Sequence, residues 1–176
     1  AAITADAGID GLRLRGAPSA MPGQPAEQAT FDRVQLRARF QRIAGGWRLD
    51  APELRFGARD NARVLDGLTV AGGQRAVLLA DHIEAGPLFA VLALSDQVPA
   101  GLRDWLRATR PQASLRNLRV VGRPNGPLYA RGRVDAFGFA AVANAPGVSG
   151  LSGDFEGDAQ GLRFVFDPKR PLRFDW

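Results

Sequence analysis

Strict alternation of apolar and polar residues constrains the fold of this chain more than any other feature. In the segment VQLRARF at 34–40, every second residue is apolar and the residues between them are Gln or Arg. A strand with this period of two buries one face and keeps the other in water. The turn sequence Ala44-Gly45-Gly46 follows and the alternation resumes at Trp47, so this region predicts an antiparallel hairpin.

The same pattern recurs along most of the chain. Further strands are predicted at 54–56, 65–70, 75–83, 114–121, 128–134, 150–156 and 162–166. Because short amphipathic strands joined by Gly-rich turns favour antiparallel pairing, the predicted fold class is mainly β. The apolar faces need a cover, which is a second sheet, helices or a bound ligand. Alternation is the same for a closed core and for an open sheet curved around an apolar ligand.

Two short helices are predicted to interrupt the strands, near 86–94 and 99–109. Apolar residues there follow helical spacing, a proline suits the first turn of the second helix, and another proline follows its end. In the second helix, Leu102, Trp105 and Leu106 form an apolar stripe. We expect this stripe to plug or cap the sheet.

The 176 residues suffice for one domain or a large piece of one, and we treat 1–176 as a single segment. Within it, 15–30 contains three prolines and little apolar periodicity, which predicts an irregular loop. Residues 86–110 form a helical insertion. The last residues, 174–176, carry an apolar strand pattern that stops abruptly, so we expect the chain to be part of a longer protein.

The composition excludes several kinds of site. Without cysteine there is no disulfide, thiolate zinc site or cysteine nucleophile. His82 is the only histidine, so a two-histidine metal site is impossible within this chain. No Walker or G-x-G-x-x-G sequence occurs, and no apolar run is long enough to span a membrane. We expect neither a metal nor a cofactor.

Asp154, Glu156 and Asp158 are the strongest candidates for chemistry, because they share one face of a predicted strand. Neighbours on such a face lie about 6.5–7 Å apart, near the spacing of an inverting glycosidase pair. The alternative is a solvated outer face opposite Leu151 and Phe155, which alternation alone predicts. A calcium loop fits poorly, because the turn glycine and the bidentate glutamate of such a loop are missing.

A serine nucleophile has little support. His82 would have to act as its base, and its place at a strand end indicates a structural or surface role. Ser149 and Ser152 both lack the full G-x-S-x-G elbow. We therefore predict no catalytic residue and no enzyme.

The net charge of +5 comes almost entirely from arginine, because Lys169 is the only lysine. In LRLR at 12–15, LRAR at 36–39 and LRNLR at 115–119, arginine is set against apolar residues, which places a basic, wet face behind an apolar one. Nucleic-acid binding requires aromatic residues on the basic face, whereas here the aromatic residues lie with the apolar set. No nucleic-acid partner is expected, and the charge is compatible with an anionic membrane surface.

Several segments carry a family resemblance. They are HIEAGPL at 82–88, LSDQVPAGLRDWLRATRP at 94–111, ASLRNL at 113–118, FGF at 137–139 and PGVSGLSG at 146–153, with Gly157-Asp158 and Gly161 beyond. Together they resemble the YhdP branch of the AsmA-like bacterial envelope proteins over roughly residues 60–176. The part before residue 60 is similar only as generic β-hairpins.

The resemblance implies a long periplasmic protein, held in the inner membrane by an N-terminal helix, whose strands form a curved, elongated groove. This groove carries phospholipid toward the outer membrane, so the chain would be an internal segment of a lipid-transfer bridge. The implied partners are phospholipid acyl chains, the remaining parts of the parent chain, and the membrane at the parent protein's ends. The alternatives are a structural or interaction β domain that supports outer-membrane assembly without conducting lipid, and an enzyme acting on envelope carbohydrate.

Candidate groove positions follow from alternation. They are Val34, Leu36, Phe40, Trp47, Leu49, Leu151, Phe155, Leu162, Phe164 and Phe166. If the resemblance holds, the glycine-rich stretch at 147–161 is a bent groove strand with its carboxylates on the wet side. Lipid transfer needs a continuous apolar surface and no nucleophile.

Overall fold

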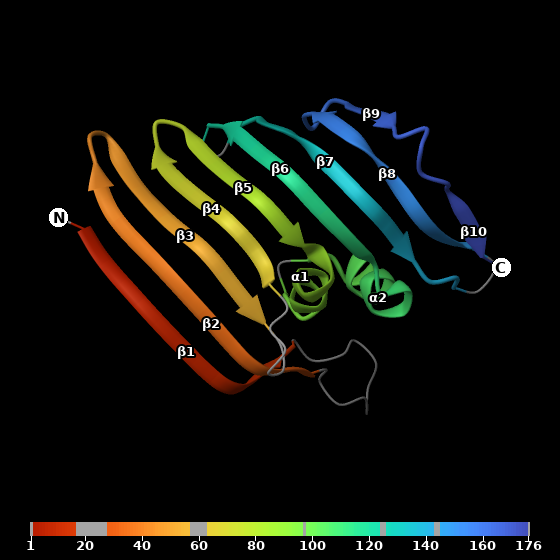
Figure 1. Ribbon diagram of the computed structural model, residues 1–176, viewed down its shortest axis with the longest axis horizontal. Coiled ribbons are helices and arrows are strands. Elements are labelled where there is room, and N and C mark those ends of the chain that lie inside the picture. Colours follow the sequence, from red (N-terminus) through yellow and green to blue (C-terminus); the bar gives the residue numbers. More distant parts are fainter. Residues whose placement is uncertain are drawn as a thin grey trace.

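The computed structural model describes residues 2–16, 28–56, 63–96, 98–123, 126–142 and 145–175. These residues form ten strands and two helices (Figure 1). The elements are β1 (Ala2–Arg15), β2 (Gln28–Ile43), β3 (Gly46–Phe56), β4 (Arg63–Gly73), β5 (Ala76–Glu84), α1 (Ala85–Leu92), α2 (Ala100–Thr109), β6 (Gln112–Gly122), β7 (Leu128–Phe139), β8 (Gly147–Gly157), β9 (Leu162–Phe166) and β10 (Arg173–Asp175). The prediction of a mainly β fold with two short helices is confirmed.

All strands belong to one antiparallel sheet with the order β1-β2-β3-β4-β5-β6-β7-β8-β10, and β9 also pairs with β8. From β1 to β8 each strand lies beside its neighbour in sequence, so the sheet is a meander with the two chain ends at opposite edges (Figure 1). The turns at 44–45, 74–75 and 158–161 lie along one rim, together with the ends of β6 and β7 at Gly122 and Leu128, and we call this rim the hairpin rim. Both helices lie at the opposite rim, the helix rim.

The strand register brings the alternating apolar residues into continuous rows, because opposed residues of an antiparallel pair project to the same face. One row crosses nine strands: Ala7, Leu36, Leu54, Leu65, Ile83, Leu115, Val134, Gly153 and Phe166. A second row crosses the same strands nearer the hairpin rim: Ile3, Phe40, Leu49, Val70, Leu78, Val120, Ala130, Gly157 and Leu162. We call the face that carries these rows the concave face.

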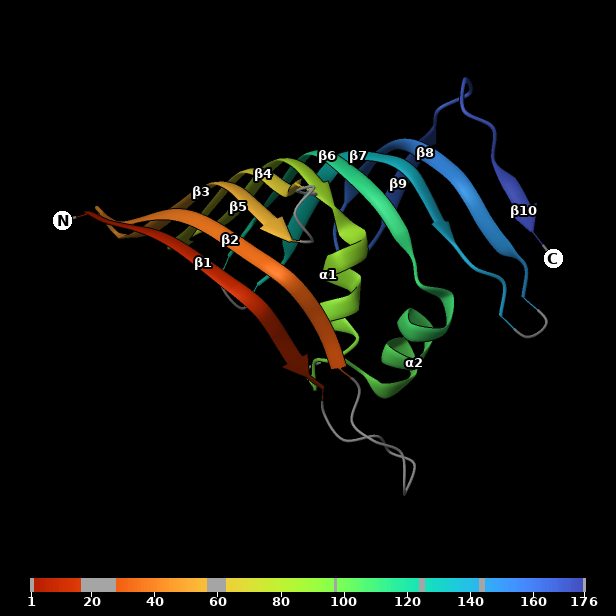
Figure 2. The same ribbon diagram turned by 60° about the horizontal axis from the view of Figure 1, so that its bottom comes forward.

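The sheet forms an arch, and both helices project beneath it from the concave face (Figure 2). Its curvature has local causes. Gly67 in β4 and Asn117 in β6 adopt positive φ angles of 65° and 51°, and β3 shifts register against β2 where Pro52 is inserted. Such irregularities bend a strand and increase its twist. At Gly67 a Cβ atom would lie 2.1 Å from a carboxylate oxygen of Asp81, so this bend requires glycine.

Packing against the sheet fixes the two helices. Leu88 of α1 packs against a buried cluster formed by Leu65, Ala80 and Ile83. In α2, the ring of Trp105 lies 5.6 Å from the ring of Phe139, measured between centroids. The helices therefore cover the concave face only near the helix rim.

The predicted element boundaries agree closely with the structure. Both helices begin and end within two residues of the predicted 86–94 and 99–109. The predicted loop at 15–30 lies mostly outside the described residues, and its two ends belong to β1 and β2.

Candidate functional site

The concave face is an open apolar surface. Side chains of its two rows remain strongly exposed, with 67% for Ile3 and Leu162, 62% for Phe166, 39% for Phe40 and 37% for Leu36. The buried apolar cluster of the sheet is confined to the region where α1 packs. A soluble domain rarely exposes a continuous apolar surface of this extent without a ligand or partner for it. The concave face is therefore the candidate functional site.

The structure places the predicted groove residues together on this face. Leu36, Phe40, Leu49, Leu162 and Phe166 belong to the two rows, while Val34 lies opposite Ile9 and Phe56, and Phe155 lies opposite Gly132 and Phe164. Trp47 packs over Gly72, and Leu151 is opposite Phe137 towards the helix rim. Their role in binding stays a prediction.

The predicted plug residues of α2 divide into two kinds. Leu106 is buried, whereas Leu102 and Trp105 remain 47% and 39% exposed. Trp105 contacts Phe139, whose ring lies 5.8 Å from that of Phe137 on the same strand. Helix α2 therefore adds an apolar wall at the helix rim, and its outer residues stay accessible.

Aromatic rings pair with one another along the concave face. Phe40 stacks with Trp47 at a centroid distance of 6.3 Å, and Phe164 meets Phe166 edge to face at 5.0 Å. Such pairs stabilise each other beyond the area that they bury. The rings are thereby held in place although nothing in the described part of the chain covers them.

Glycines of β7 and β8 make room for these rings. At Gly153 a Cβ atom would lie 2.6 Å from the ring of Phe164, and at Gly132 it would lie 3.2 Å from the ring of Phe155. Aromatic side chains that lie across strand glycines cover the exposed backbone there. Strand β8 thus accepts the ring of Phe164 over its Gly153 and covers Gly132 of β7 with its own Phe155.

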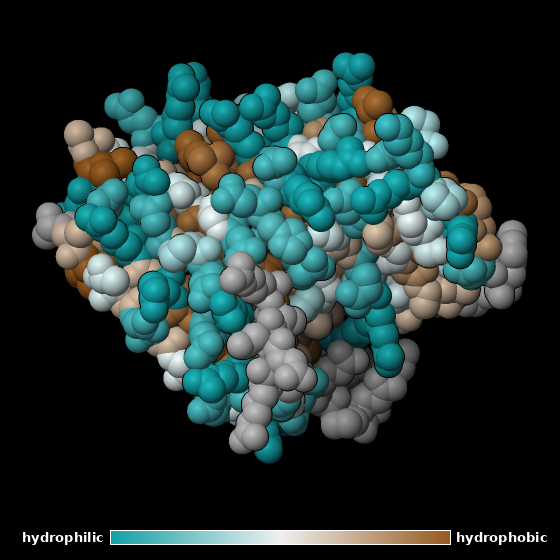
Figure 3. Space-filling view, viewed as in Figure 1, coloured by the Kyte–Doolittle hydropathy of each residue, from teal (hydrophilic) through white to brown (hydrophobic). Residues whose placement is uncertain are grey.

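The outer, convex face of the same strands is polar, and Figure 3, which looks onto it, is mostly teal. One row across it consists of Asp6, Arg37, Glu53, Asp66, His82, Arg116, Arg133 and Asp154. Many neighbours in this row are opposite in charge, such as Arg37 and Asp6 with Nη2 and Oδ2 3.0 Å apart. Opposite charges on adjacent strands favour the observed register.

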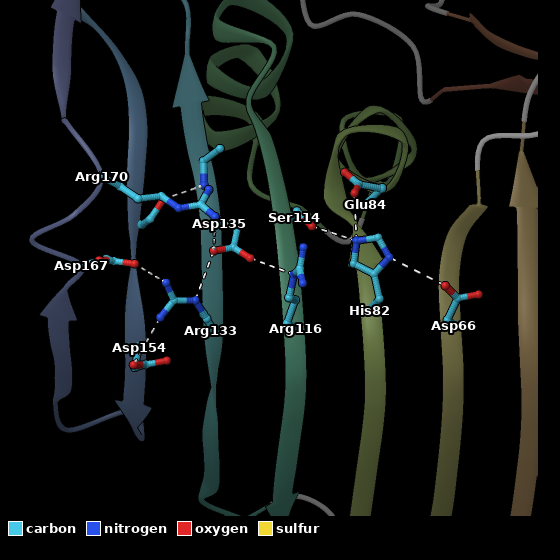
Figure 4. A network of polar contacts seen from close by, with 12 residues as sticks. Asp66, His82, Glu84, Ser114, Arg116, Arg133, Asp135, Asp154, Asp167 and Arg170 are labelled. Atoms are coloured by element: carbon cyan, nitrogen blue, oxygen red, sulfur yellow. Dashed lines mark hydrogen bonds and ion pairs between the residues drawn. The ribbon is translucent and has the colours of Figure 1, made fainter.

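A denser polar network lies on β6, β7 and the segment after β9 (Figure 4). The Asp135 carboxylate is buried, with 7% of its side chain exposed, and its oxygens lie 2.8 Å from Nε of Arg116 and 3.2 Å from Nε of Arg133. Arg133 also forms an ion pair with Asp167, and Arg170 approaches Asp135 at 3.9 Å. The network ties the C-terminal segment to the sheet.

The three carboxylates singled out in the sequence take part in structural contacts. Asp154 lies 3.6 Å from an Arg133 nitrogen, and Glu156 accepts a hydrogen bond from the Tyr129 hydroxyl at 3.2 Å. Asp158 accepts the backbone N–H of Gln160 at 2.9 Å in the β8–β9 turn. Asp154 and Glu156 are thus held by cross-strand contacts on the convex face, and Asp158 is held within a turn.

His82 lies on the convex face beside two carboxylates and a hydroxyl (Figure 4). Its Nε2 is 2.8 Å from Oγ of Ser114 and 2.9 Å from Oε1 of Glu84, and its Nδ1 is 3.8 Å from Oδ2 of Asp66. The set is reminiscent of a hydrolase triad, but Glu84 competes with Ser114 for the one nitrogen that would take the serine proton. The arrangement fits cross-strand pairing better than nucleophilic catalysis.

Among the acidic groups, three have shifted pKa values with clear causes. The hydrogen bond from Arg48 lowers the pKa of the Asp50 carboxyl, and Thr69 adds to this effect. For Asp167, the backbone N–H of Lys169 contributes most to the lowered pKa. Partial burial raises the pKa of the Tyr129 hydroxyl. All three groups lie outside the concave rows, and none is arranged for acid–base chemistry.

The described ranges contain neither a membrane-spanning helix nor a metal-binding group. No helix among them is long and apolar enough to cross a membrane. Within the same ranges, no group of three or more His, Asp or Glu side chains is arranged to hold a metal ion.

A protein-family model described as "YhdP protein" matches residues 5–174. The chain belongs to the YhdP family. The match extends the resemblance seen in residues 60–176 to the first hairpins, which alone look generic. Comparison with curated proteins and with solved structures gives no match. The YhdP family is a family of envelope proteins, and an open, curved β-sheet is compatible with a lipid-transfer groove.

Part of the concave face escaped the sequence prediction. Ile3, Val70, Leu78 and Val120 belong to the second apolar row but were not among the candidate groove residues. The signal for Val70 and Leu78 was present, because both lie in predicted strands at alternating positions. Their place beside Phe40 and Leu49 becomes visible only from the strand register.

Proposed function

We propose that this YhdP-family chain is a segment of a periplasm-spanning phospholipid conduit, in which the concave face shields acyl chains from water. The observation that carries this proposal is the apolar surface formed by two uncharged rows across nine strands, which stays accessible outside the cluster that α1 covers. With strands about 4.8 Å apart, such a row extends about 40 Å. An acyl chain laid against it gains about 0.8 kcal/mol for each CH₂ removed from water.

Envelope-family membership supports a place in the periplasm, within a parent protein that is anchored in the inner membrane. In that setting the open edges of the sheet are positions for further strands. In the described part of the chain, β1 is the strand at one edge of the sheet and is 14 residues long. At the other edge, the short strands β9 and β10 cover only parts of β8. Neighbouring strands of the parent chain would protect these edges and lengthen the groove.

The alternative is a structural or interaction β domain whose concave face packs permanently against another part of the parent protein. It shares the exposed apolar face, so the two functions differ in what covers that face. A phospholipid that enters and leaves distinguishes the conduit from a fixed protein cover. We do not propose an enzyme, because Asp154 and Glu156 are engaged in ion pairs and hydrogen bonds on the convex face.

The test is mass spectrometry of lipids extracted from the protein after purification from a bacterial envelope in mild detergent. One variant changes Phe40, Leu162 and Phe166 on the concave face to Gln. The matched control changes Leu79 and Val165, which are 36% and 51% exposed on the convex face, to Gln. Both variants replace exposed apolar side chains, so both are expected to fold.

We expect phospholipid to copurify with the natural chain and the convex control, and to fall at least about tenfold in the concave variant. Circular dichroism checks that all three proteins keep the same strand content. Equal lipid in both variants, or no lipid in any of them, would support the structural domain instead.

A further inference from the structure

The concave face changes character at the hairpin rim. Its two apolar rows contain no charged residue, but the next position of β2 on this face is Arg42, directly opposite Trp47. Trp47 stacks with Phe40, and its indole lies against Gly72, where a Cβ atom would be only 2.6 Å away. These contacts place Trp47, and with it the opposed Arg42, on the concave face. Arg42 is therefore an exposed cation at the margin of an apolar surface.

Arg42 differs from two arginines on the other side of the same strand, Arg33 and Arg37. On the convex face, Arg33 lies 3.6 Å from Asp10, and Arg37 lies 3.0 Å from Asp6. Within the described ranges no carboxylate forms an ion pair with Arg42. A cation beside a hydrophobic surface, without an acidic side chain to neutralise it, is a site for an anionic group carried by an apolar ligand.

Two more arginines extend this basic margin along the hairpin rim. Arg75 in the β4–β5 turn and Arg123 after β6 line an open pocket of about 460 Å³ at the edge itself, between Leu128 on the concave side and Tyr129, whose hydroxyl donates to Glu156 on the convex side. Neither arginine has an ion-pair partner in the described part of the chain. Asp158 is the one carboxylate of this pocket, and it accepts backbone N–H groups of the β8–β9 turn.

The two rims differ in what they allow to leave the groove. Helices α1 and α2 stand beneath the sheet at the helix rim (Figure 2), whereas the described part of the hairpin rim contains turns and no helix. An amphiphile on the concave face can therefore keep its polar end in water at the hairpin rim. Trp47 lies at this margin with Arg42, and an indole favours the boundary between apolar and polar surroundings.

Resting on the proposed function, we propose that the hairpin rim binds the phosphate of phospholipid head groups. Arg42 contacts the phosphate from inside the groove, and Arg75 and Arg123 provide further positive charge along the rim. The acyl chains then run from Trp47 across the apolar rows towards the wall formed by α2. Lipids would pass along the sheet with one fixed orientation, head groups at the hairpin rim.

The orientation can be tested with the two tryptophans at opposite rims. Two single-tryptophan proteins are made, W105F/W176F to keep Trp47 and W47F/W176F to keep Trp105. Each is loaded with phosphatidylglycerol brominated either near the head group or near the chain end, because bromine quenches a nearby indole. We expect head-proximal bromine to quench Trp47 more strongly and chain-end bromine to quench Trp105 more strongly. The reverse pattern, or equal quenching of both, overturns the orientation.

The phosphate contact can be tested with a lipid that lacks it. The natural chain is incubated with phosphatidylglycerol or with diacylglycerol of the same acyl chains, and retained lipid is measured by mass spectrometry. We expect about fivefold more phosphatidylglycerol than diacylglycerol, and loss of this preference in Arg42→Gln. The matched control is Arg119→Gln, since Arg119 is an exposed convex arginine opposite Arg131 and should keep the preference.

The possible outcomes separate this inference from the proposed function. If both lipids are retained without preference, the head-group site is wrong while the conduit stands. If neither lipid is retained, the proposed function fails and the inference fails with it. If inorganic phosphate alone binds the natural chain, and Arg42→Gln abolishes that binding without changing lipid preference, the rim is a site for free phosphate and the inference is overturned.

Discussion

The two faces of this sheet are made by the same strands but are stabilised in different ways. On the convex face, charged side chains are paired across strands, and the buried Asp135 is surrounded by three arginines. On the concave face, large apolar side chains touch their neighbours but remain accessible over much of their area. In β9 the two conditions alternate, because Arg163 pairs with Glu156 on the convex face while Leu162 and Phe164 lie on the concave face. The comparison shows that cross-strand contacts on the outer face hold a sheet whose inner face stays open.

The largest contrast is expected within the concave face itself, between its covered and uncovered parts. Ile83→Ala removes a side chain that is 6% exposed beneath α1 and should lower the free energy of unfolding by about 3 kcal/mol. Phe166→Ala removes a larger side chain that is 62% exposed and should cost less than about 1 kcal/mol. Urea denaturation measures both. Equal losses would mean that the concave face is a hidden core.

The next contrast concerns the glycines that lie beneath aromatic rings. Gly153→Val would place a Cβ atom 2.3 Å from the Val165 carbonyl oxygen and 2.6 Å from the ring of Phe164, so β9 must separate from β8. We expect a loss of about 2 kcal/mol and faster amide hydrogen exchange in 162–166. Gly161→Ala is the control, because its Cβ atom meets nothing within 4 Å. Unchanged exchange in the Gly153 variant would contradict the close packing.

The convex network gives no larger effect, because its arginines are partly exposed. Asp135→Asn leaves Arg116 and Arg133 without their buried carboxylate and should lower the free energy of unfolding by about 2 kcal/mol. Asp154→Asn removes a carboxylate that is 68% exposed and 3.6 Å from Arg133, and should change stability by less than about 0.5 kcal/mol. Thermal denaturation of the pair checks this. Similar shifts in both would show that burial of Asp135 contributes nothing.

The smallest effect is expected in the loss of stability at acid pH. The pKa of Asp50 and that of Asp167 lie below the ordinary carboxyl value of 3.8 in the folded protein. Their contribution is therefore complete above that value and is lost as the pH falls below it, through the lowered pKa values. Asp167→Asn should flatten the fall in melting temperature between neutral pH and pH of about 3, compared with the natural chain. If the melting temperature of this variant falls with pH as it does in the natural chain, Asp167 does not contribute to the pH dependence of stability.

The sequence predicted the elements well because each carries a local signal. Alternation identified β2 and β3, and helical spacing of leucines with flanking prolines identified α1 and α2 to within two residues. Strand β1 was not predicted over its full length, because its segment ITADAGID alternates small residues that are weak strand formers. Its pairing with β2 over 13 opposed positions supplies the stability that its own residues lack.

The composition of the site was predictable, but its arrangement was not. Alternation placed Leu36, Phe40 and Phe166 on apolar faces, and the structure puts them on one face of one sheet. Sequence could not show that Phe40 and Leu162 share a row, because this depends on seven successive registers and on bulges that correct the phase. Likewise, the sequence places Arg42 two residues after Phe40, on the same face of the strand. Only the strand register shows that Arg42 lies opposite Trp47 and which arginines have no acidic residue beside them.

The rows of the concave face have a kinetic consequence. In the proposed conduit, each step from one strand to the next, about 4.8 Å, exchanges one uncharged contact for another. Because neither row contains a charged residue, the potential-energy profile of a hydrocarbon chain displaced along it has no electrostatic step and no built-in slope from one end to the other. Movement on a profile without such a slope is diffusion without preferred direction. Any net flux along this sheet must then be set by a difference in chemical potential between its two ends.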